Sequence, residues 1–396
     1  MNKIVVLALL ALAVVGCKTQ QNLPQTSTRP EPDSVLIDTV AQVPDYYVTA
    51  KQDTLTSLDE EVEIALYRVL KDTVTIIGVG DIMMGTNFPS SDYLPGNRGR
   101  DLWSEVSDTL RQADVTFGNL EGVILNEGGE QKQCKNPKVC YLFRSPEYML
   151  DNLTDAGFDV VSLANNHAGD FGDEGRVNTM KALDTVGIHY AGLIDAPYTV
   201  FERDGMKYGM VAFSPNKGTI LIHHLEQAKR LVAQLDSMVD VVIVSFHAGA
   251  EGHEHQHVTR ESEYYYGEDR GNVYAFARQM IDQGADVIFG HGPHVTRAVD
   301  LYKDRFIAYS LGNFCTYGRF NLRGVKGVAP IIRVSTDGQG RFLRAQIIPT
   351  YQGGAGGPKF DLDGRAIRII QELTEKDFPE SNLRIDDSGI ISYIEN

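Results

Sequence analysis

The 396-residue chain has no excess of positive charge: 37 Lys and Arg residues face 53 Asp and Glu residues, leaving a net charge of −16. This balance excludes bulk binding of nucleic acid, or of an anionic lipid surface, through a basic face. No internal repeat is found, and the four cysteines show no spacing typical of a zinc-cysteine site. The hydrophobic content of 42% is still sufficient for a core, and the length fits one large domain or two ordinary ones.

The N-terminus resembles an export signal. Lys3 provides the positive charge, and the apolar run from Ile4 to Val15 is too short to span a membrane comfortably. The run ends in Val-Val-Gly-Cys17, which is typical of a bacterial lipoprotein signal and implies cleavage before Cys17 and lipidation of its thiol. The alternative is an ordinary secretory signal with an incidental cysteine. Both interpretations predict export; the first predicts a lipid anchor in a bacterial membrane, on its periplasmic or cell-surface face.

After the signal at 1–17, the polar composition of 18–72 predicts a flexible linker, with a short helix expected at Asp59–Leu70. A globular domain is expected at 73–352. A C-terminal extension with one helix should occupy 353–396, beginning at the glycine cluster Gly353–Gly357.

Strands and helices alternate from Thr73 to Phe289, which predicts an α/β fold. Strands are expected near 73–79, 114–117, 159–163, 199–203, 208–213, 239–246 and 286–289. Helices are expected near 102–112, 147–156, 175–186, 225–238 and 273–283, two of them ending at Gly157 and Gly187. Beyond Arg297, strands joined by short turns predict a second, antiparallel sheet packed on the first.

Two cysteines, Cys134 and Cys140, flank a short polar loop. In an oxidising compartment they could form a disulfide; the alternative is two unrelated thiols. Cys315 is interpreted as a small buried hydrophobe.

Polar side chains follow several apolar strands, at the place where an open α/β sheet binds ligands. They are Asp81, Asn119, Glu121, Asn166, His167, His247, His291 and His294. Each group also has an alternative interpretation. Asp81 could cap a helix, Asn119 and Glu121 could form a turn, and His167 could be a core imidazole with satisfied hydrogen bonds. Three imidazoles at the ends of two neighbouring strands favour a metal site suited to Zn, Mn, Fe or Ni.

Other polar groups favour recognition. Asn313 follows another strand, and Arg319 and Arg323 could hold an anionic substrate, although plain surface charge is the alternative. The alternating His253, His255 and His257 are interpreted as a solvated loop rather than as metal ligands.

Six motifs occur in one order: Gly80-Asp-Ile-Met-Met-Gly85, Asn119-Leu-Glu121, Ser162-Leu-Ala-Asn-Asn-His167, His247-Ala-Gly-Ala-Glu251, Gly290-His-Gly-Pro-His294 and Ser310-Leu-Gly-Asn-Phe314. Together they resemble the CapA family of poly-γ-glutamate capsule synthesis proteins, which is similar to the calcineurin-like metallophosphatases. The resemblance implies a two-sheet β-sandwich flanked by helices, in α-β-β-α layers, with one or two divalent ions (Zn, Mn or Fe). The implied metal ligands are Asp81, Glu121, Asn166, His247, His291 and His294.

The resemblance also implies that His167 assists the leaving group. Substrate contacts are expected from Asn119, Glu251, Asn313, Arg319 and Arg323. The chain departs from the metallophosphatase pattern at Met83, where a His is usual, and at Asn119, where an Asp bridges the two metals. One metal position therefore lacks a ligand.

The resemblance predicts an exported, metal-dependent hydrolase or transferase that acts on an anionic envelope polymer or its precursor, alongside capsule synthesis machinery and with no nucleic-acid partner. The alternative is a non-catalytic component of capsule assembly or export that binds polymer through a partly degraded site. A nucleotidase-type phosphatase is a third hypothesis, supported by fold analogy alone.

Overall fold

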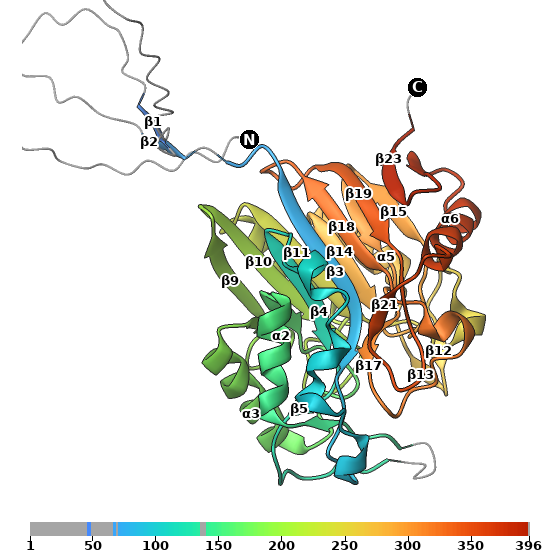
Figure 1. The fold of residues 1–396 in the computed structure, drawn as a ribbon. Coiled ribbons are helices and arrows are strands. Elements are labelled where there is room, and N and C mark those ends of the chain that lie inside the picture. The colour runs from blue at the N-terminus through green and yellow to red at the C-terminus, as the bar shows by residue number, and fades with distance from the viewer. Residues whose placement is uncertain (1–45, 49–65, 69, 135–139, 395–396) are drawn as a thin grey trace, which may run out of the picture. The chain divides into compact units, whose positions relative to one another are not determined.

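The computed structural model describes residues 46–48, 66–68, 70–134 and 140–394 (Figure 1). The chain divides after Leu70 into two units. In the first, β1 (Tyr46–Val48) pairs antiparallel with β2 (Leu66–Arg68), so the helix expected over Asp59–Leu70 is wrong at these positions. Cys17, the predicted signal and most of the predicted linker lie outside the described residues. In the ranges that are described, no helix is both long and apolar enough to cross a bilayer.

A six-stranded sheet forms one layer of the second unit, counted over the described residues, in the order β15-β16-β14-β11-β10-β9. Its centre is parallel: β10 (Met206–Phe213), β11 (Val241–His247), β14 (Val287–His291) and β16 (Arg305–Ala308). Antiparallel strands close its edges: β9 (Tyr198–Arg203) and β15 (Val299–Tyr302). Every residue of β11 is buried, as expected for a parallel strand covered on both faces.

A second sheet, nine-stranded over the same described residues, has the order β22-β23-β19-β18-β3-β4-β7-β8, with β17 also paired to β3. Its parallel strands are β3 (Val74–Met83), β4 (Val115–Leu120), β7 (Val160–Ser162), β8 (His189–Ala191) and β17 (Asn313–Thr316). Its antiparallel strands are β18 (Ile331–Thr336), β19 (Phe342–Ile348), β22 (Leu383–Ile385) and β23 (Ile390–Tyr393). In the described residues of the second unit, three small pairs lie outside the two sheets. One is parallel, β5 (Val123–Ile124) with β6 (Arg144–Ser145), and two are antiparallel, β12 (Tyr264–Tyr265) with β13 (Glu268–Asp269) and β20 (Thr350–Gln352) with β21 (Pro358–Phe360).

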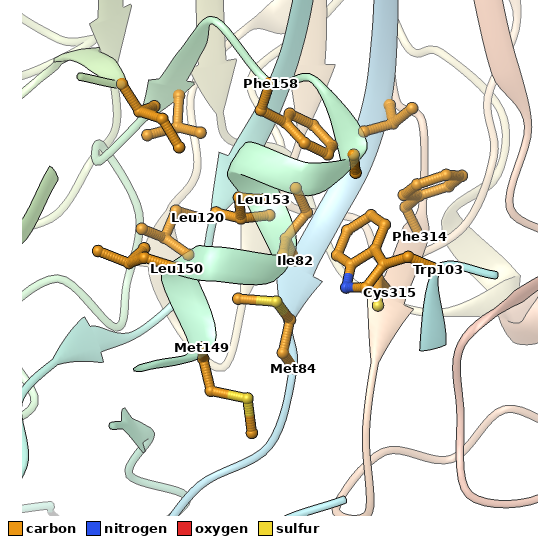
Figure 2. Packing of buried hydrophobic residues seen from close by; sticks show 14 of the residues in the cluster. Ile82, Met84, Trp103, Leu120, Met149, Leu150, Leu153, Phe158, Phe314 and Cys315 are labelled. Atoms are coloured by element: carbon orange, nitrogen blue, oxygen red, sulfur yellow. The ribbon is translucent and has the colours of Figure 1, made fainter. Parts of the chain in front are cut away.

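Helices cover the outer face of each sheet. The nine-stranded sheet packs against α1 (Ser107–Leu110), α2 (Leu150–Ala156) and α3 (Gly172–Val186). Figure 2 shows part of this contact, with Leu150 and Leu153 of α2 close to Leu120 and Ile82. The six-stranded sheet packs against α4 (Leu225–Asp236) and α5 (Val273–Asp282), while α6 (Arg365–Asp377) contacts β15 of this sheet and β19 of the other. The predicted two-sheet sandwich in α-β-β-α layers is confirmed.

The inner faces of the two sheets meet in an apolar layer. Phe117 of β4 and Phe289 of β14 stack across it with ring centroids 5.4 Å apart. A side chain at Gly78 would place its Cβ 2.4 Å from the Phe289 ring, so only glycine fits there without displacement. This close approach brings the backbone of β3 next to β14, and the polar residues near the carboxyl ends of both strands come together as a result.

The separate antiparallel sheet expected beyond Arg297 is wrong. The local turns are present, because β15 and β16 form a hairpin, as do β18 and β19. The first hairpin, however, joins the six-stranded sheet beside β14, and the second joins the nine-stranded sheet beside β3. Short-range turn residues determine which strands pair as hairpins, but not the sheet edge to which a hairpin adds.

The helix ends and the cysteines follow the sequence more closely than the first helix does. Gly157 and Gly187 end α2 and α3 in the left-handed conformation, as predicted. The helix expected over 102–112 shrinks to α1, because Leu102, Trp103 and Val106 enter the core in non-α turns before it begins. Cys134 and Cys140 form a disulfide, and Cys315 is buried.

Candidate metal centre

Polar side chains gather near the carboxyl ends of parallel strands, and both sheets contribute. Asp81 lies inside β3 rather than beyond it, because β17 pairs with β3 at this level and extends the strand to Met83. Glu121 follows β4 directly, and His247 is the last residue of β11. His294 stands three residues beyond β14. Asp81, Glu121 and His247 are at most 1% exposed, so any charge that they carry requires a partner.

Glu121, His247 and His294 form a group that could hold a metal ion, with one ligand atom from each lying within 4.8 Å of the others. Glu121 Oε1 lies 3.9 Å from His247 Nε2 and 3.7 Å from His294 Nε2. Both carboxylate oxygens of Glu121 and Nε2 of His247 are buried without a hydrogen-bond partner. Buried polar atoms are rarely left unpaired, and one carboxylate with two imidazoles is a donor set that Zn, Mn and Fe accept. These residues therefore fit the expected divalent ion.

Asp81 orients one of these imidazoles. His294 Nδ1 lies 2.8 Å from Asp81 Oδ2, and because a carboxylate can only accept, Nδ1 carries the hydrogen. The unprotonated nitrogen of neutral His294 is then Nε2, on the side of Glu121. Carboxylate–imidazole pairs of this kind fix the tautomer of metal-binding histidines. His294 also adopts a φ of 54°, which costs a non-glycine residue on the order of 1–3 kcal/mol and persists where the surroundings enforce it.

Charges within the group shift its pKa values strongly. Burial opposes ionisation of Asp81, but the hydrogen bond and charge of His294 lower the pKa of Asp81 to about 2. Burial likewise opposes a charge on His294, but Glu121 and Asp81 raise the pKa of His294 to about 10. Burial raises the pKa of Glu121 to about 7 and lowers that of His247 well below its usual value. His294 is thus the cation that balances the buried carboxylates in the metal-free chain.

His167 stands beside this group, with Nε2 4.0 Å from Glu121 Oε1. Its Nδ1 donates to Asp170 Oδ2 at 2.7 Å, and its ring lies 4.4 Å from that of Phe143. Burial lowers the pKa of His167, but the Asp170 carboxylate outweighs burial and raises it. Sequence reasoning missed Asp170, although its position three residues after His167 in a tight turn was a usable signal.

Asparagine side chains surround the carboxylates. Asn119 Nδ2 donates to Asp81 Oδ1 at 2.8 Å and lies 3.3 Å from His247 Nδ1, and its Oδ1 accepts from Asn165 Nδ2 at 3.3 Å. Asn166 Oδ1 is buried without a partner, while its backbone oxygen accepts from Lys132 Nζ at 2.7 Å. Asn119 thus presents amide hydrogens where the resemblance expects a carboxylate that bridges two metals.

His291 is not brought into the group of three. Its Nε2 donates to the Val79 backbone oxygen at 3.1 Å, and its Nδ1 lies 3.4 Å from Ser245 Oγ. Burial lowers the pKa of its ring, so it is neutral. Its role as a ligand stays a prediction.

The predicted substrate contacts are dispersed. Asn313 donates to the backbone oxygen of His294 at 3.1 Å, and Glu251 pairs with the buried Arg270 at 3.1 Å. Arg319 packs over the ring of Tyr93, with its guanidinium carbon 4.9 Å from the ring centroid. Arg323 is exposed on the following loop. No described contact joins either arginine to the candidate ligands.

Residues 75–317 match the family model described as "Bacterial capsule synthesis protein PGA_cap". The chain is 30% identical over 263 residues to the capsule biosynthesis protein CapA of Bacillus anthracis, covering 61% of this chain and 60% of that one. It is 28% identical over 261 residues to the PGA biosynthesis protein CapA of Bacillus subtilis (strain 168), covering 61% and 63%. The chain therefore spans less than two thirds of these relatives' length.

Among solved structures, the chain is similar to a 5'-nucleotidase precursor from Thermus thermophilus, with a TM-score of 0.39 and 14% identity. That match covers 77% of this chain and 59% of the other.

Proposed function

This chain belongs to the bacterial capsule synthesis protein family PGA_cap, and from that premise we propose that it is a metal-dependent hydrolase or transferase in the synthesis of a capsule or another envelope polymer. The observation that carries the proposal is the convergence of Glu121, His247 and His294, drawn from both sheets, with unpartnered buried atoms on the first two.

Glu121 Oε1, His247 Nε2 and His294 Nε2 would hold one divalent ion, either Zn, Mn or Fe. Such an ion would polarise a phosphoryl or acyl oxygen and activate a water molecule. Asp81 would hold a hydrogen on Nδ1 of His294 through its 2.8 Å bond, so that Nε2 is the nitrogen left for the ion once His294 has lost its extra proton. We favour one ion over two, since Asn119 offers hydrogens and Met83 offers no imidazole.

His167 would donate a proton to the leaving group from Nε2. Asp170 would hold the ring in place through Nδ1, and its charge keeps His167 protonated to a higher pH than usual because the pKa is raised. Lys132 stands beside both residues, 3.8 Å from Asp170 Oδ1, and could meet an anionic leaving group. Arg319 and Arg323 would steer an anionic chain from farther away.

The substrate proposed is an anionic envelope polymer or its precursor, with the capsule synthesis machinery as partner. The names of the two CapA relatives support this choice. We also propose that the chain is exported and anchored through Cys17; the Cys134–Cys140 disulfide supports export, because such bonds persist in oxidising compartments. Radiolabelled palmitate incorporation in cells, lost in Cys17→Ser, tests the anchor.

A second candidate is a non-catalytic component that binds polymer through a degraded site. The observation in its favour is Asn119, whose amide nitrogen donates a hydrogen bond to Asp81 and lies beside His247. A residue that binds metal in this position would have to offer lone pairs instead.

Elemental analysis beside a substrate screen tests the proposal. Wild type, His247→Ala and Glu121→Gln are purified together, and each is offered phosphoesters and γ-glutamyl polymers. Metal and turnover in wild type alone support the hydrolase. Metal in wild type without turnover on either class favours the binding component, and equal metal in all three proteins refutes the site.

A further inference from the structure

Arg297 is a fully buried arginine that ties together the loops carrying two of the candidate ligands. It follows His294 by three residues. Its Nη2 donates to the backbone oxygen of Ala250, three residues after His247, at 3.3 Å, and its Nε donates to that of His255 at 2.8 Å. The Arg297 guanidinium, which belongs to the segment after β14, thus donates hydrogen bonds to the segment after β11.

Glu263 supplies the opposite charge. Its two oxygens accept from Arg297 Nη1 at 2.8 Å and Nη2 at 2.7 Å, a fork-to-fork geometry that fixes both groups. Glu263 Oε2 also accepts from the backbone nitrogen of Ala250 at 2.8 Å. Ala250 is therefore held by both partners, through its N–H and through its carbonyl.

The segment that leads to Glu263 is itself fastened at two points. Gly252 N donates to the backbone oxygen of Pro293 at 2.9 Å, next to His294. Farther along, His257 Nδ1 and Val258 N bond to the Asp377 carboxylate at the end of α6, at 2.7 and 2.9 Å. These contacts describe a brace between α6 and the ligand loops rather than a free lid over the site.

We propose that Arg297 and Glu263 are positioning residues that set the separation of His247 and His294 and so the affinity for the metal. The inference rests on the metal site proposed above. A buried ion pair is weak evidence for stability, since apolar residues of similar volume often replace one without loss. Apolar residues would not, however, reproduce the four hydrogen bonds by which Arg297 joins the two ligand loops.

A second pair, of a buried carboxylate with a half-buried arginine, provides a control. Asp286 stands at the amino end of β14, opposite the candidate site, and accepts from Arg305 Nε at 2.8 Å and from Val242 N at 2.8 Å. Glu263→Gln and Asp286→Asn therefore make the same change: each turns a buried carboxylate, bound to one arginine and one backbone N–H, into an amide. Only the first lies between ligand loops.

The full chain and both variants are stripped of metal and titrated with Zn²⁺ against a competing chelator, at a temperature where circular dichroism shows each to be folded. The visible spectrum of bound Co²⁺ reports the ligand geometry independently. We expect Glu263→Gln to weaken Zn²⁺ binding by about tenfold or more and to change the Co²⁺ spectrum, in the range seen when groups supporting metal ligands are lost. Asp286→Asn should keep both properties.

Wild-type affinity in Glu263→Gln, or an equal loss in both variants, overturns the inference. If Glu263→Gln does not fold, the double variant Arg297→Met with Glu263→Leu replaces it, and the same expectation applies: a folded protein with weakened Zn²⁺ binding. Failure of wild type to bind Zn²⁺ or Co²⁺ at all refutes the metal site itself, an outcome distinct from normal wild-type binding with no effect of Glu263→Gln.

Discussion

Asp81 and His294 are joined by a 2.8 Å hydrogen bond that runs from one sheet of the sandwich to a loop of the other. They are 213 residues apart in the sequence. The bond selects the tautomer of His294, and it places a carboxylate behind a candidate ligand rather than in the group of three.

Asp81→Ala should therefore weaken metal binding while leaving the three candidate ligands present. We expect the affinity for Zn²⁺ to fall by about 10- to 100-fold, the usual effect of removing a group that orients a ligand. Chelator competition measures it. Direct coordination by Asp81 would instead show as loss of stoichiometric metal in that variant.

Metal uptake should release protons. The pKa of His294 is raised to about 10 in the metal-free chain, so His294 is protonated at pH 7.5 and must lose its proton to bind an ion. Affinity should then rise with pH, by up to about tenfold per unit below pH 10 for one proton. Calorimetry in two buffers of different ionisation enthalpy counts the protons; identical heats in both would contradict the prediction.

The same pKa shift predicts how the stability of the metal-free chain depends on pH. Because the folded-state pKa of His294 lies above the unfolded value of about 6.5, its contribution is complete below pH 6.5 and is lost as the pH rises through 10. With a chelator present, the thermal unfolding temperature should therefore fall more between pH 7 and 10 in wild type than in His294→Gln. Parallel curves for the two proteins would count against the ion pair.

Asp170→Asn should leave the metal in place and reduce turnover. The amide that replaces the carboxylate carries no charge to stabilise protonated His167, so the pKa of His167 would fall and its ring would be held less firmly. General acids contribute about 10²- to 10⁴-fold, which bounds the loss of kcat. The basic limb of the pH–rate profile should move to lower pH. An unchanged profile would remove His167 from the mechanism.

Gly78→Ala should destabilise the sandwich. The new Cβ would lie 2.4 Å from the Phe289 ring, and overpacking of this kind costs about 1–3 kcal/mol. Gly96→Ala is the control, because Gly96 has negative φ and no atom within 4 Å of an added Cβ, so it should change the unfolding free energy by less than about 0.5 kcal/mol. Urea titration of both variants separates the two cases.

The parts of the fold that depend on local pattern could be predicted from the sequence. Val241–Phe246 is apolar throughout, apart from one serine, and becomes a buried strand, and Gly157 ends α2. The order of strands in the sheets could not be predicted, since nothing local to β18 indicates that it pairs with β3.

The candidate site could likewise be predicted only in part. Position after a strand singled out Glu121 and His247, because the parallel strands that carry them, one in each sheet, end on the same side of the sandwich. It did not separate His291, which bonds to Val79, from His294, which faces Glu121. Arg270 and Arg297 were missed because the sequence gives no sign that a charged side chain will be buried; that depends on partners such as Glu263, 34 residues away from Arg297.

Because Glu121 comes from one sheet and His247 from the other, an ion shared by them would cross-link the two sheets at one end of the sandwich. The opposite end is joined by other contacts, among them the stacked rings of Phe306 and Phe342, the ion pair of Lys71 with Asp204 and the hydrogen bond from the Phe342 backbone nitrogen to the Asp304 backbone oxygen. Chelation should therefore increase amide hydrogen exchange in the loops beyond β11 and β14 first, while the amino ends of the same strands exchange as slowly as before. Binding of the ion would then control how often the loops around its own site open.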